Sequence, residues 1–548
     1  MAPGGPAAPA ATARNRMSLF ANLFRNALAR ITRGQNADAS APQLSELGES
    51  SNRRGGASHQ DVLSAGLEKL RAGDLVGAEK YFEAAAGRLA DPAEAQLYLG
   101  VSLIRQKRYE DALDCFILAL HLRPDLAEAR FQLGLAQIHL EQFDQAIENF
   151  QAVVDLKPDY ADAHCNLGYA LYKHREELDQ AEAHLRRALE LDPRKLEAQT
   201  NLAIVLDHRG HSDEALGLYE RILSITPEDN EVRLNRSLIL LARGDYARGW
   251  AEYEARRALG SHRKFPFPEW DGSALDGRVV LIHAEQGLGD EIMFASCVGD
   301  VIARARHCFI ECHSKLEKIF RRSFPVATVH GALQTETLQH WLEREPKIDC
   351  KIGTGSLPLH FRRHRADFPV HTGYLRADPG RAEYWRSRLA ALGAGPKVGI
   401  SWRGGAVRTR RYMRSVPLEH WTPLLSLPGM HFVSLQYGDC QDEIEAVRKS
   451  SGVRVHHWTE AIEDYDETAS LVSSLDLVIS VQTAVIHLGG ALGRPVWVLV
   501  SARPEWRYQE AGESLPWYPS VRLIRQAAAD QWTPVIDEAR QRLRRWPA

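Results

Sequence analysis

Two short segments in the C-terminal half of this 548-residue chain carry residue types that could do chemistry. In the first, Glu285 to Asp290 reads Glu-Gln-Gly-Leu-Gly-Asp and follows a continuous apolar run. Asp290 then stands where a glycine turn enters a helix, either as a helix-capping acid or as a general base at the mouth of a cleft. Gly287 and Gly289 suit a phosphate-binding turn, but Ile292 replaces the third glycine of the dinucleotide pattern, so this signal alone is weak.

The second segment is Gln482-Thr483 followed by an apolar helical stretch. Thr483 is placed to cap that helix, and His487 lies four residues further on, on the same helix face. A helix N-terminus exposes free N–H groups and a partial positive charge. This segment therefore predicts a site for a diphosphate.

The surrounding sequence predicts parallel strands and helices that position both segments. Continuous apolar runs are typical of strands covered on both faces. Residues 279–282 form such a run, and residues 397–402, 431–436 and 475–481 are also assigned to strands. Helices are expected at residues 291–306 and 484–492. We expect two α/β halves, a linker at about residues 374–395, and a cleft between the halves with ligands at the carboxyl ends of the strands.

The N-terminal half has a different period. Pro124, Pro158, Pro193 and Pro227 are separated by 34, 35 and 34 residues. Alanine and a large apolar residue precede each proline by 12 and 8 residues, as at Ala112 and Phe116 before Pro124, and a glycine such as Gly100 stands earlier in three of the four repeats. This is the pattern of tetratricopeptide (TPR) repeats, in which small residues let two helices approach and proline ends the second. Six copies between residues 58 and 258 predict a stacked superhelix with a concave face.

Side-chain amides occur in phase within these repeats. They stand two residues before the glycine position, at Gln132, Asn166, Asn201 and Asn235. If stacking aligned them, a row of donors and acceptors could hold the backbone of an extended acceptor peptide. The alternative interpretation is local hydrogen bonding within each repeat.

Several further segments between about residues 242 and 526 carry a family resemblance, and they occur in the expected order. They are Gly244-Asp245-Tyr246, Gly249-Trp250, Tyr253-Glu254, Glu285 to Asp290, Arg414-Ser415, Ser434-Leu435-Gln436, Leu475 to Gly493 and Trp517-Tyr518-Pro519. With the repeats, the chain resembles bacterial TPR-linked glycosyltransferases related to glycosyltransferase family 9, the lipopolysaccharide heptosyltransferases. It is similar in architecture to O-GlcNAc transferase and to TPR-bearing flagellin glycosyltransferases.

The resemblance implies the GT-B fold, in which two Rossmann-like halves enclose a cleft. The expected organisation is a leader at residues 1–57, a TPR superhelix at 58–258, an N-terminal GT-B half at 262–392 and a C-terminal half at 393–548. The implied reaction moves a sugar from a nucleotide-sugar substrate with inversion, and it needs neither a metal nor a separate cofactor.

The resemblance also implies roles for individual residues. Asp290 corresponds to the proposed general base. The expected donor-binding residues are Gly287, Gly289, Arg403, Arg414, Gln436, Gln482, Thr483 and His487. The chain departs from the family at Gln482, where an aspartate is usual, and at Ile486, where a small residue is usual. The departure at Gln482 favours altered donor contacts, while loss of activity stays open.

Two functions from different classes therefore remain. The first is a glycosyltransferase that modifies a protein held by the TPR groove, such as a flagellin or another surface protein; a lipid or polysaccharide acceptor is a variant of it. The second is a TPR scaffold with a degenerate, non-catalytic GT-B module. A formal charge of −3 gives no global basic field, so we expect no nucleic-acid partner.

Cysteine usage and the N-terminal leader bear on location. Seven scattered cysteines suit a reducing compartment, so we expect a cytoplasmic protein. His307-Cys308 and Cys312-His313 flank a predicted strand, on which alternating side chains do not converge on one metal.

The composition of the leader favours disorder. Residues 17–34 could instead form a short amphipathic helix that rests on a membrane or a partner, and Met17 is an alternative start.

Overall fold

The computed structural model describes residues 59–87, 92–260, 265–332, 347–405 and 411–546. The chain divides into two compact units, the first ending at Ile222 and the second beginning at Leu223. The predicted leader, residues 1–57, and the amphipathic segment within it lie outside the described residues. No described helix is both long enough and apolar enough to cross a bilayer.

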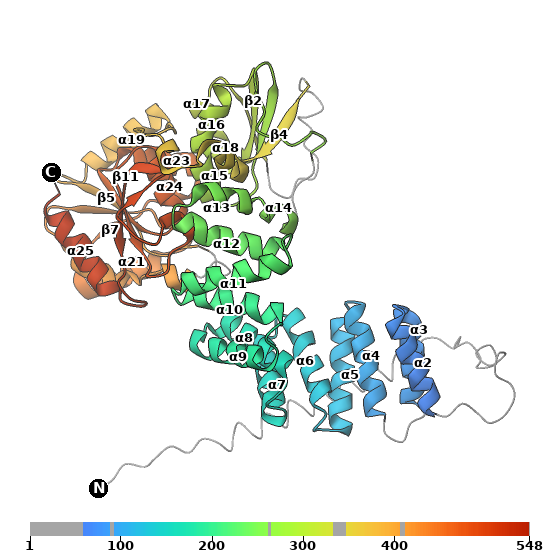
Figure 1. Ribbon diagram of the computed structural model, residues 1–548. Coiled ribbons are helices and arrows are strands. Elements are labelled where there is room, and N and C mark those ends of the chain that lie inside the picture. The colour runs from blue at the N-terminus through green and yellow to red at the C-terminus, as the bar shows by residue number, and fades with distance from the viewer. Residues whose placement is uncertain (1–58, 88–91, 261–264, 333–346, 406–410, 547–548) are drawn as a thin grey trace, which may run out of the picture. The chain divides into compact units, whose positions relative to one another are not determined.

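The first unit consists of helical hairpins (Figure 1). Their helices are α2 (His59–Arg71) and α3 (Leu75–Ala86), α4 (Ala93–Arg105) and α5 (Tyr109–Leu122), α6 (Ala127–His139) and α7 (Phe143–Leu156), α8 (Ala161–Ala170) and α9 (Leu178–Leu191), and α10 (Leu196–His208) and α11 (Ser212–Ile225). Each hairpin is one sequence period, so the predicted helix pairs are confirmed.

The packing inside a hairpin explains the glycine and aromatic positions. A Cβ added at Gly100 would lie 2.5 Å from Phe116 Cε1, and one at Gly134 would lie 2.7 Å from Phe150 Cε1. The aromatic ring therefore occupies the space that a side chain on the first helix would need. Ala112 and Phe116 are fully buried, which fits close approach of the two helices.

The single 35-residue spacing also has a structural counterpart. Helix α8 continues into a π-helical turn, η1 (Leu171–Arg175), before Glu176 takes a left-handed conformation. A π turn holds one more residue per hydrogen-bonded ring than an α turn. The extra residue is thereby absorbed within the hairpin that lies between Pro158 and Pro193.

The second unit begins with a helix pair and a four-stranded sheet. The helices are α12 (Asn230–Ala242), α13 (Tyr246–Tyr253) and α14 (Arg256–Leu259). The parallel strands are β1 (Val279–His283), β2 (His307–His313), β3 (Thr328–Ala332) and β4 (Cys350–Gly353), in the order β3-β2-β1-β4. Helices of this part are α15 (Leu288–Phe294), α16 (Val298–Ile302), α17 (Glu317–Ser323) and α18 (Leu357–Phe361).

A seven-stranded sheet follows, in the order β10-β11-β9-β8-β5-β6-β7. Its strands are β5 (Lys397–Ser401), β6 (His431–Ser434), β7 (Val455–His456), β8 (Leu477–Val481), β9 (Val496–Val500), β10 (Ser514–Leu515) and β11 (Tyr518–Arg525). Only β10 pairs antiparallel. Its helices are α19 (Pro379–Ala390), α20 (Thr422–Leu425), α21 (Gln441–Ser451), α22 (Thr459–Glu463), α23 (Tyr465–Ser474), α24 (Ala484–Ala491) and α25 (Trp532–Arg544).

These elements confirm an α/β architecture and the four predicted strand positions, with one correction between the halves. The predicted linker, residues 374–395, contains helix α19. Glu467 on α23 accepts hydrogen bonds from Trp385 Nε1 at 2.8 Å and from Arg381 Nε at 2.7 Å. This segment is therefore a packed helix rather than a simple connection.

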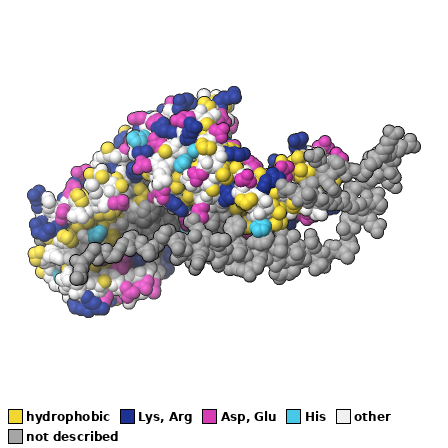
Figure 2. Space-filling model, turned by 90° about the horizontal axis from the view of Figure 1, so that it is seen from below, with side chains coloured by type: hydrophobic (Ala, Val, Ile, Leu, Met, Phe, Trp, Pro, Cys, Tyr) yellow, Lys and Arg dark blue, Asp and Glu magenta, His cyan; other side chains and the backbone are white. Residues whose placement is uncertain are grey.

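The second unit also includes the last repeat-like helix pair. Trp250 and Tyr253 on α13 belong to the same buried cluster as Val280 on β1 and Val478 on β8. The predicted TPR region extends to residue 258, but α12 and α13 pack within the second unit. On the face shown in Figure 2, basic and acidic side chains are interspersed, in line with the small net charge.

Candidate functional site at the carboxyl ends of the strands

The loop after β1 carries Asp290, and its helix begins earlier than expected. Helix α15 starts at Leu288, its N-cap is Gly287, and the N–H of Glu291 donates to Gly287 O at 3.0 Å. Asp290 therefore lies inside the first turn, and the prediction that it caps the helix is wrong. Its carboxylate is one-fifth exposed, so it sits at the edge of the solvent-accessible surface.

The two glycines of this loop differ in their surroundings. A Cβ added at Gly289 would lie 3.2 Å from His487 Cδ2 and 3.5 Å from Ala484 Cα. Gly289 thus lets the first turn of α15 pack against the first turn of α24. At Gly287 the nearest atom would be Asp290 Oδ2 at 3.7 Å, which leaves room for a side chain. Donor binding by either glycine stays a prediction.

An alternating row of charges links Asp290 to the other α/β half. Arg507 in the 3₁₀ turn η10 (Trp506–Tyr508) forms an ion pair with Asp290. Arg507 Nε lies 3.0 Å from Glu505 Oε2, and Glu505 Oε1 accepts from Arg414 Nη1 at 2.6 Å. We call Asp290, Arg507, Glu505 and Arg414 the charge chain. It joins the predicted base to one predicted donor-binding arginine.

Arg507 is the buried centre of this chain. Burial opposes its charge, but Asp290 and Glu505 outweigh that effect and raise its pKa above the usual value. The guanidinium also lies 5.4 Å from the centre of the Trp506 ring. Arg507 is not among the site residues that the sequence analysis assigned. No local pattern reveals that Arg507 meets an acid 217 positions earlier in the chain.

His487 is buried at the junction of the two helices. It is only 2 % exposed, and its Nδ1 lies 3.1 Å from the Tyr518 hydroxyl. Burial, assisted by the positive charge of Arg507, lowers the pKa of His487 well below its usual value. The imidazole is therefore neutral near pH 7, so any role in donor binding must be that of a neutral hydrogen-bonding group.

Thr483 occupies the N-cap position of α24 but does not cap it. Its side chain makes no hydrogen bond to the first turn, and its Oγ1 lies 3.0 Å from Ser480 Oγ instead. The prediction of a side-chain cap is wrong because the hydroxyl is directed back to the end of β8.

Three buried glutamines follow strands of the seven-stranded sheet and hold neighbouring loops. Gln436 Oε1 accepts from the N–H groups of Trp402 at 3.0 Å and Arg403 at 2.8 Å. Gln482 Oε1 accepts from Ser501 Oγ at 2.9 Å, after the adjacent strand β9. Gln526, which the sequence analysis missed, follows β11 and accepts from Ala502 N at 3.0 Å.

This arrangement explains how glutamine is accommodated at position 482. The side chain is 1 % exposed, and its carbonyl oxygen gives Ser501 an acceptor, as a carboxylate would. Its Nε2 is buried without a hydrogen-bond partner among the described residues. Gln436 and Gln482 therefore position loops, and direct donor contacts from them stay predictions.

Arg403 and Arg414 occupy separate environments in the described structure. Arg403 lies 3.2 Å from Glu443 Oε2 and donates to Asp439 O at 2.5 Å. Arg414 belongs to the charge chain. The structure thus brings Asp290, Gly289, His487 and Arg414 toward one junction, whereas Arg403 pairs with residues that follow β6.

The last repeat-like helices support the Asp290 loop directly. Tyr253 OH accepts from Gln286 Nε2 at 2.8 Å, and Arg256 Nη2 pairs with Glu285 Oε2 at 2.7 Å. The Trp250 ring meets the Trp506 ring edge-on at 5.4 Å between centroids. These side chains recur every three residues along α13 and α14, so one helical face holds both the Asp290 loop and the Arg507 turn.

The predicted amide row is not uniformly available for a peptide. In the first unit, Gln132 donates to Glu128 Oε1 at 3.0 Å and Asn166 donates to Asp162 O at 2.9 Å. Asn201 is only 9 % exposed and its Nδ2 lies 3.8 Å from Cys165 Sγ. Asn235 lies in the second unit and is half-buried. The observed bonds of the first two are local, as in the alternative interpretation.

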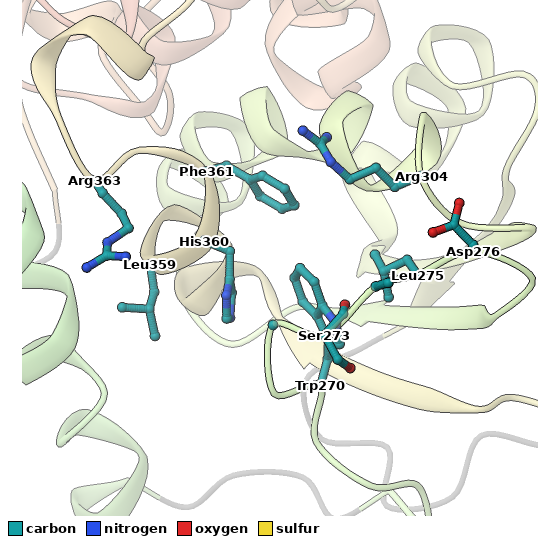
Figure 3. Close-up of a pocket in the computed structure, with 11 residues that line it drawn as sticks. Trp270, Ser273, Leu275, Asp276, Arg304, Leu359, His360, Phe361 and Arg363 are labelled. Atoms are coloured by element: carbon teal, nitrogen blue, oxygen red, sulfur yellow. The ribbon is translucent and has the colours of Figure 1, made fainter.

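Two cavities lie away from Asp290. One of about 570 Å³ is lined by the rings of Trp270, His360 and Phe361, with Arg304 over the Phe361 ring and Asp276 nearby (Figure 3). Asp276 precedes β1, so this cavity lies at the amino ends of the strands, whereas Asp290 follows β1. Another of about 740 Å³ lies in the first unit and includes Gln137, Gln145 and Asn149 among its lining residues.

The seven cysteines are spread over both units of the chain. All seven cysteines are unpaired and buried. The predicted strand is confirmed but is longer than expected, because β2 spans His307–His313 and includes both flanking pairs. His307 Nε2 lies 2.9 Å from Thr328 Oγ1. The part of the chain that the structure describes contains no group of three or more metal-ligating side chains.

Comparison with known proteins confirms the repeats. Tetratricopeptide repeat models match residues 63–127, 99–165 and 174–239. Protein FlbA of Caulobacter vibrioides is 34% identical over 325 residues, which cover 56% of this chain and 54% of FlbA. The chain thus spans about half the length of this curated relative. The matched share of this chain is larger than residues 1–258, so the match extends into the α/β part.

Several solved structures resemble about a third of the chain. MamA from Desulfovibrio magneticus RS-1 is 22% identical over 32% of this chain and 98% of its own, with a TM-score of 0.29. YrrB, a TPR protein with an unusual peptide-binding site, is 20% identical over 36% of this chain and 98% of its own, with a TM-score of 0.29. TTC0263, a TPR protein of Thermus thermophilus, is 25% identical over 33% of this chain and 97% of its own, with a TM-score of 0.28.

Proposed function

We propose that the chain is a GT-B-type glycosyltransferase that transfers a sugar from a nucleotide-sugar donor to a protein acceptor. The observation that carries this proposal is the position of Asp290. Its partly exposed carboxylate follows a parallel strand of one α/β half and meets Arg507 of the other half. Ligands of open α/β sheets bind at such carboxyl ends. The resemblance in sequence to family 9 glycosyltransferases supports the same assignment.

In the proposed reaction, Asp290 accepts the proton of an acceptor hydroxyl as that oxygen attacks the anomeric carbon. The bond between sugar and nucleotide breaks on the opposite side, so the configuration inverts. Arg414 and Arg507 supply fixed positive charge where the leaving diphosphate develops negative charge. A carboxylate is a weak base near pH 7, so positioning of the reactants contributes much of the rate.

The acceptor is proposed to be a protein bound by the repeats, such as a flagellin or another surface protein. TPR arrays present extended surfaces that suit peptide partners. The relation to FlbA covers 56% of this chain and 54% of FlbA. Seven unpaired, buried cysteines support a reducing compartment, so we place the reaction in the cytoplasm.

Asp290→Asn tests the catalytic assignment. We expect transfer to fall by about 100-fold or more, the range of general base catalysis. Asp442→Asn is the matched control, because Asp442 is also an acid in the first turn of a helix, α21. Sugar addition would be measured by intact-protein mass spectrometry with a panel of nucleotide sugars. Undiminished transfer by Asp290→Asn would exclude Asp290 as the base.

A TPR scaffold with a non-catalytic α/β module is the second candidate. The observation that favours it is Gln482, which replaces the family acid and is turned into the protein. Thermal shift with UDP, GDP, CMP and ADP separates the candidates, because a nucleotide that binds only the folded chain raises the Tm. Nucleotide-dependent addition of a sugar to any partner protein would refute the scaffold.

A further inference from the structure

The charge chain contains two acids and two arginines, so its formal charge is balanced without a ligand. All four side chains are partly buried: their exposed fractions are 19% for Asp290, 15% for Arg507, 35% for Glu505 and 11% for Arg414. An incoming anion cannot simply add to a balanced, partly buried cluster, because an extra charge there would lack a partner. The anion must displace one of the acids from its ion pair with an arginine.

The two acids are held differently. Glu505 is two residues from Arg507 on the same loop, and its two oxygens pair with two different arginines. Asp290 comes from the other half of the unit, and within the described residues its ion pair is with Arg507 alone. Asp290 is therefore the acid that an anion would displace.

We propose that Arg507 binds the diphosphate of the donor and that its ion pair with Asp290 blocks the base until the diphosphate displaces it. This inference rests on the proposed function. Arginine presents a planar fork that matches phosphate oxygens, and a diphosphate carries more negative charge than one carboxylate. The diphosphate replaces Asp290 as the ion-pair partner of Arg507, and the released Asp290 carboxylate can then accept a proton from the acceptor hydroxyl.

The proposal makes an unusual prediction about affinity. In Asp290→Asn the charge of Asp290 is gone and Arg507 keeps only its pairing with Glu505, so inorganic pyrophosphate should bind more tightly than to the wild-type chain. We expect at least about a fivefold gain, the lower end of measured couplings between sites. In Arg507→Gln the affinity should fall by about tenfold or more, the value of a charge-assisted hydrogen bond.

Glu443→Gln is the matched control for charge. Glu443 pairs with Arg403, which lies on the same α/β half as Arg507, but neither residue belongs to the charge chain. If Asp290→Asn acts through Arg507, Glu443→Gln should change pyrophosphate affinity less than twofold. The double variant Asp290→Asn/Arg507→Gln should show no gain over Arg507→Gln alone.

Isothermal titration calorimetry with inorganic pyrophosphate on the full chain gives these affinities. The proposal is overturned if Asp290→Asn does not tighten binding, if Glu443→Gln tightens it equally, or if neither the wild-type chain nor Asp290→Asn binds pyrophosphate. Should Arg507→Gln fail to fold, the comparison of Asp290→Asn with Glu443→Gln still decides. Tightened binding without sugar transfer would refute the proposed function alone, while transfer without tightened binding would refute the displacement of Asp290 alone.

Discussion

The same repeat position has different surroundings in the two units. Phe116 and Phe150 lie over the signature glycine of their own hairpins in the first unit. Tyr253 stands in the same phase, 34 residues after Tyr219. In the second unit, however, Tyr253 accepts a hydrogen bond from Gln286 in the Asp290 loop.

This difference shows how a repeat can be adapted without losing its period. The small residue is still required, because a Cβ at Gly249 on α13 would lie 2.7 Å from Leu241 Cγ and Cδ2 on α12. The hairpin therefore keeps its internal packing. Its Tyr253 bonds to the Asp290 loop of the α/β part, whereas Phe116 and Phe150 pack inside their own hairpins.

The largest effect is expected from removing the aromatic anchor of each unit. Trp250→Ala should destabilise the second unit by about 3–5 kcal/mol, the usual cost of deleting a large buried aromatic. The reason is that Trp250 is 1 % exposed, touches Phe294 and Trp506, and donates to Arg362 O at 2.9 Å. Phe150→Ala should have a comparable effect confined to the first unit.

Hydrogen exchange with peptide-level mass spectrometry would measure both variants. Peptides of the seven-stranded sheet should lose protection in Trp250→Ala, and peptides of α6 and α7 should lose it in Phe150→Ala. Equal loss of protection in both units for either variant would show that the two units do not unfold independently.

Glycine replacements test whether close approach is needed in both units. Gly134→Ala and Gly249→Ala should each destabilise their unit by about 1–3 kcal/mol, because overpacking displaces Phe150 or Leu241. The control is Gly217→Ala in α11, where a Cβ meets nothing within 4 Å. That change should stabilise the helix by up to about 1 kcal/mol. Urea denaturation gives the free energies; a destabilising Gly217→Ala would contradict this view.

The repeats and strands could be predicted because their determinants are local. Gly134 and Phe150 pack within one hairpin, and the run before His283 is buried on every residue. The 35-residue spacing before Pro193 also revealed an extra residue in the sequence, but it did not predict that a π turn would hold this residue.

The site was harder to predict because its contacts join distant segments. Arg507 reaches Asp290 across 217 positions, and Gln482 depends on Ser501 of the next strand. Asn201 has the expected phase but is buried against Cys165. Residue type and spacing identify which side chains could act, whereas tertiary packing decides which of them face a ligand.

A smaller effect is expected from the hydrogen bond that joins the repeat-like helix to the Asp290 loop. Tyr253→Phe removes the acceptor of Gln286 Nε2 and keeps the ring, so the second unit should lose about 1 kcal/mol. Amide exchange in residues 285–294 should become faster. Tyr98→Phe in the first unit is the control, since the Tyr98 ring stacks on Phe82 at 5.8 Å between centroids. Unchanged exchange at 285–294 would show that Tyr253 does not support the loop.

The smallest effect concerns acid sensitivity of the first unit. His164 Nδ1 lies 3.0 Å from His184 Nδ1, so only one of these two nitrogens can carry a proton while the contact is kept. Burial lowers the pKa of both rings below 6.5. Below about pH 6.5 the unfolded chain therefore binds more protons than the folded chain does. The contribution of the pair to the free energy of unfolding is complete above that pH and is lost as the pH falls. His184→Gln should flatten this decline.

Denaturation of the first unit at pH 7.5 and 5.5, followed by peptide-level exchange, would measure that slope. The second unit provides the comparison, because burial also lowers the pKa of His283, to about 4, and of His487. His184→Gln should leave the pH dependence of the second unit unchanged. An equally steep decline of the first unit in His184→Gln would mean that other groups bind the protons, and the histidine pair would then have no part in its acid response.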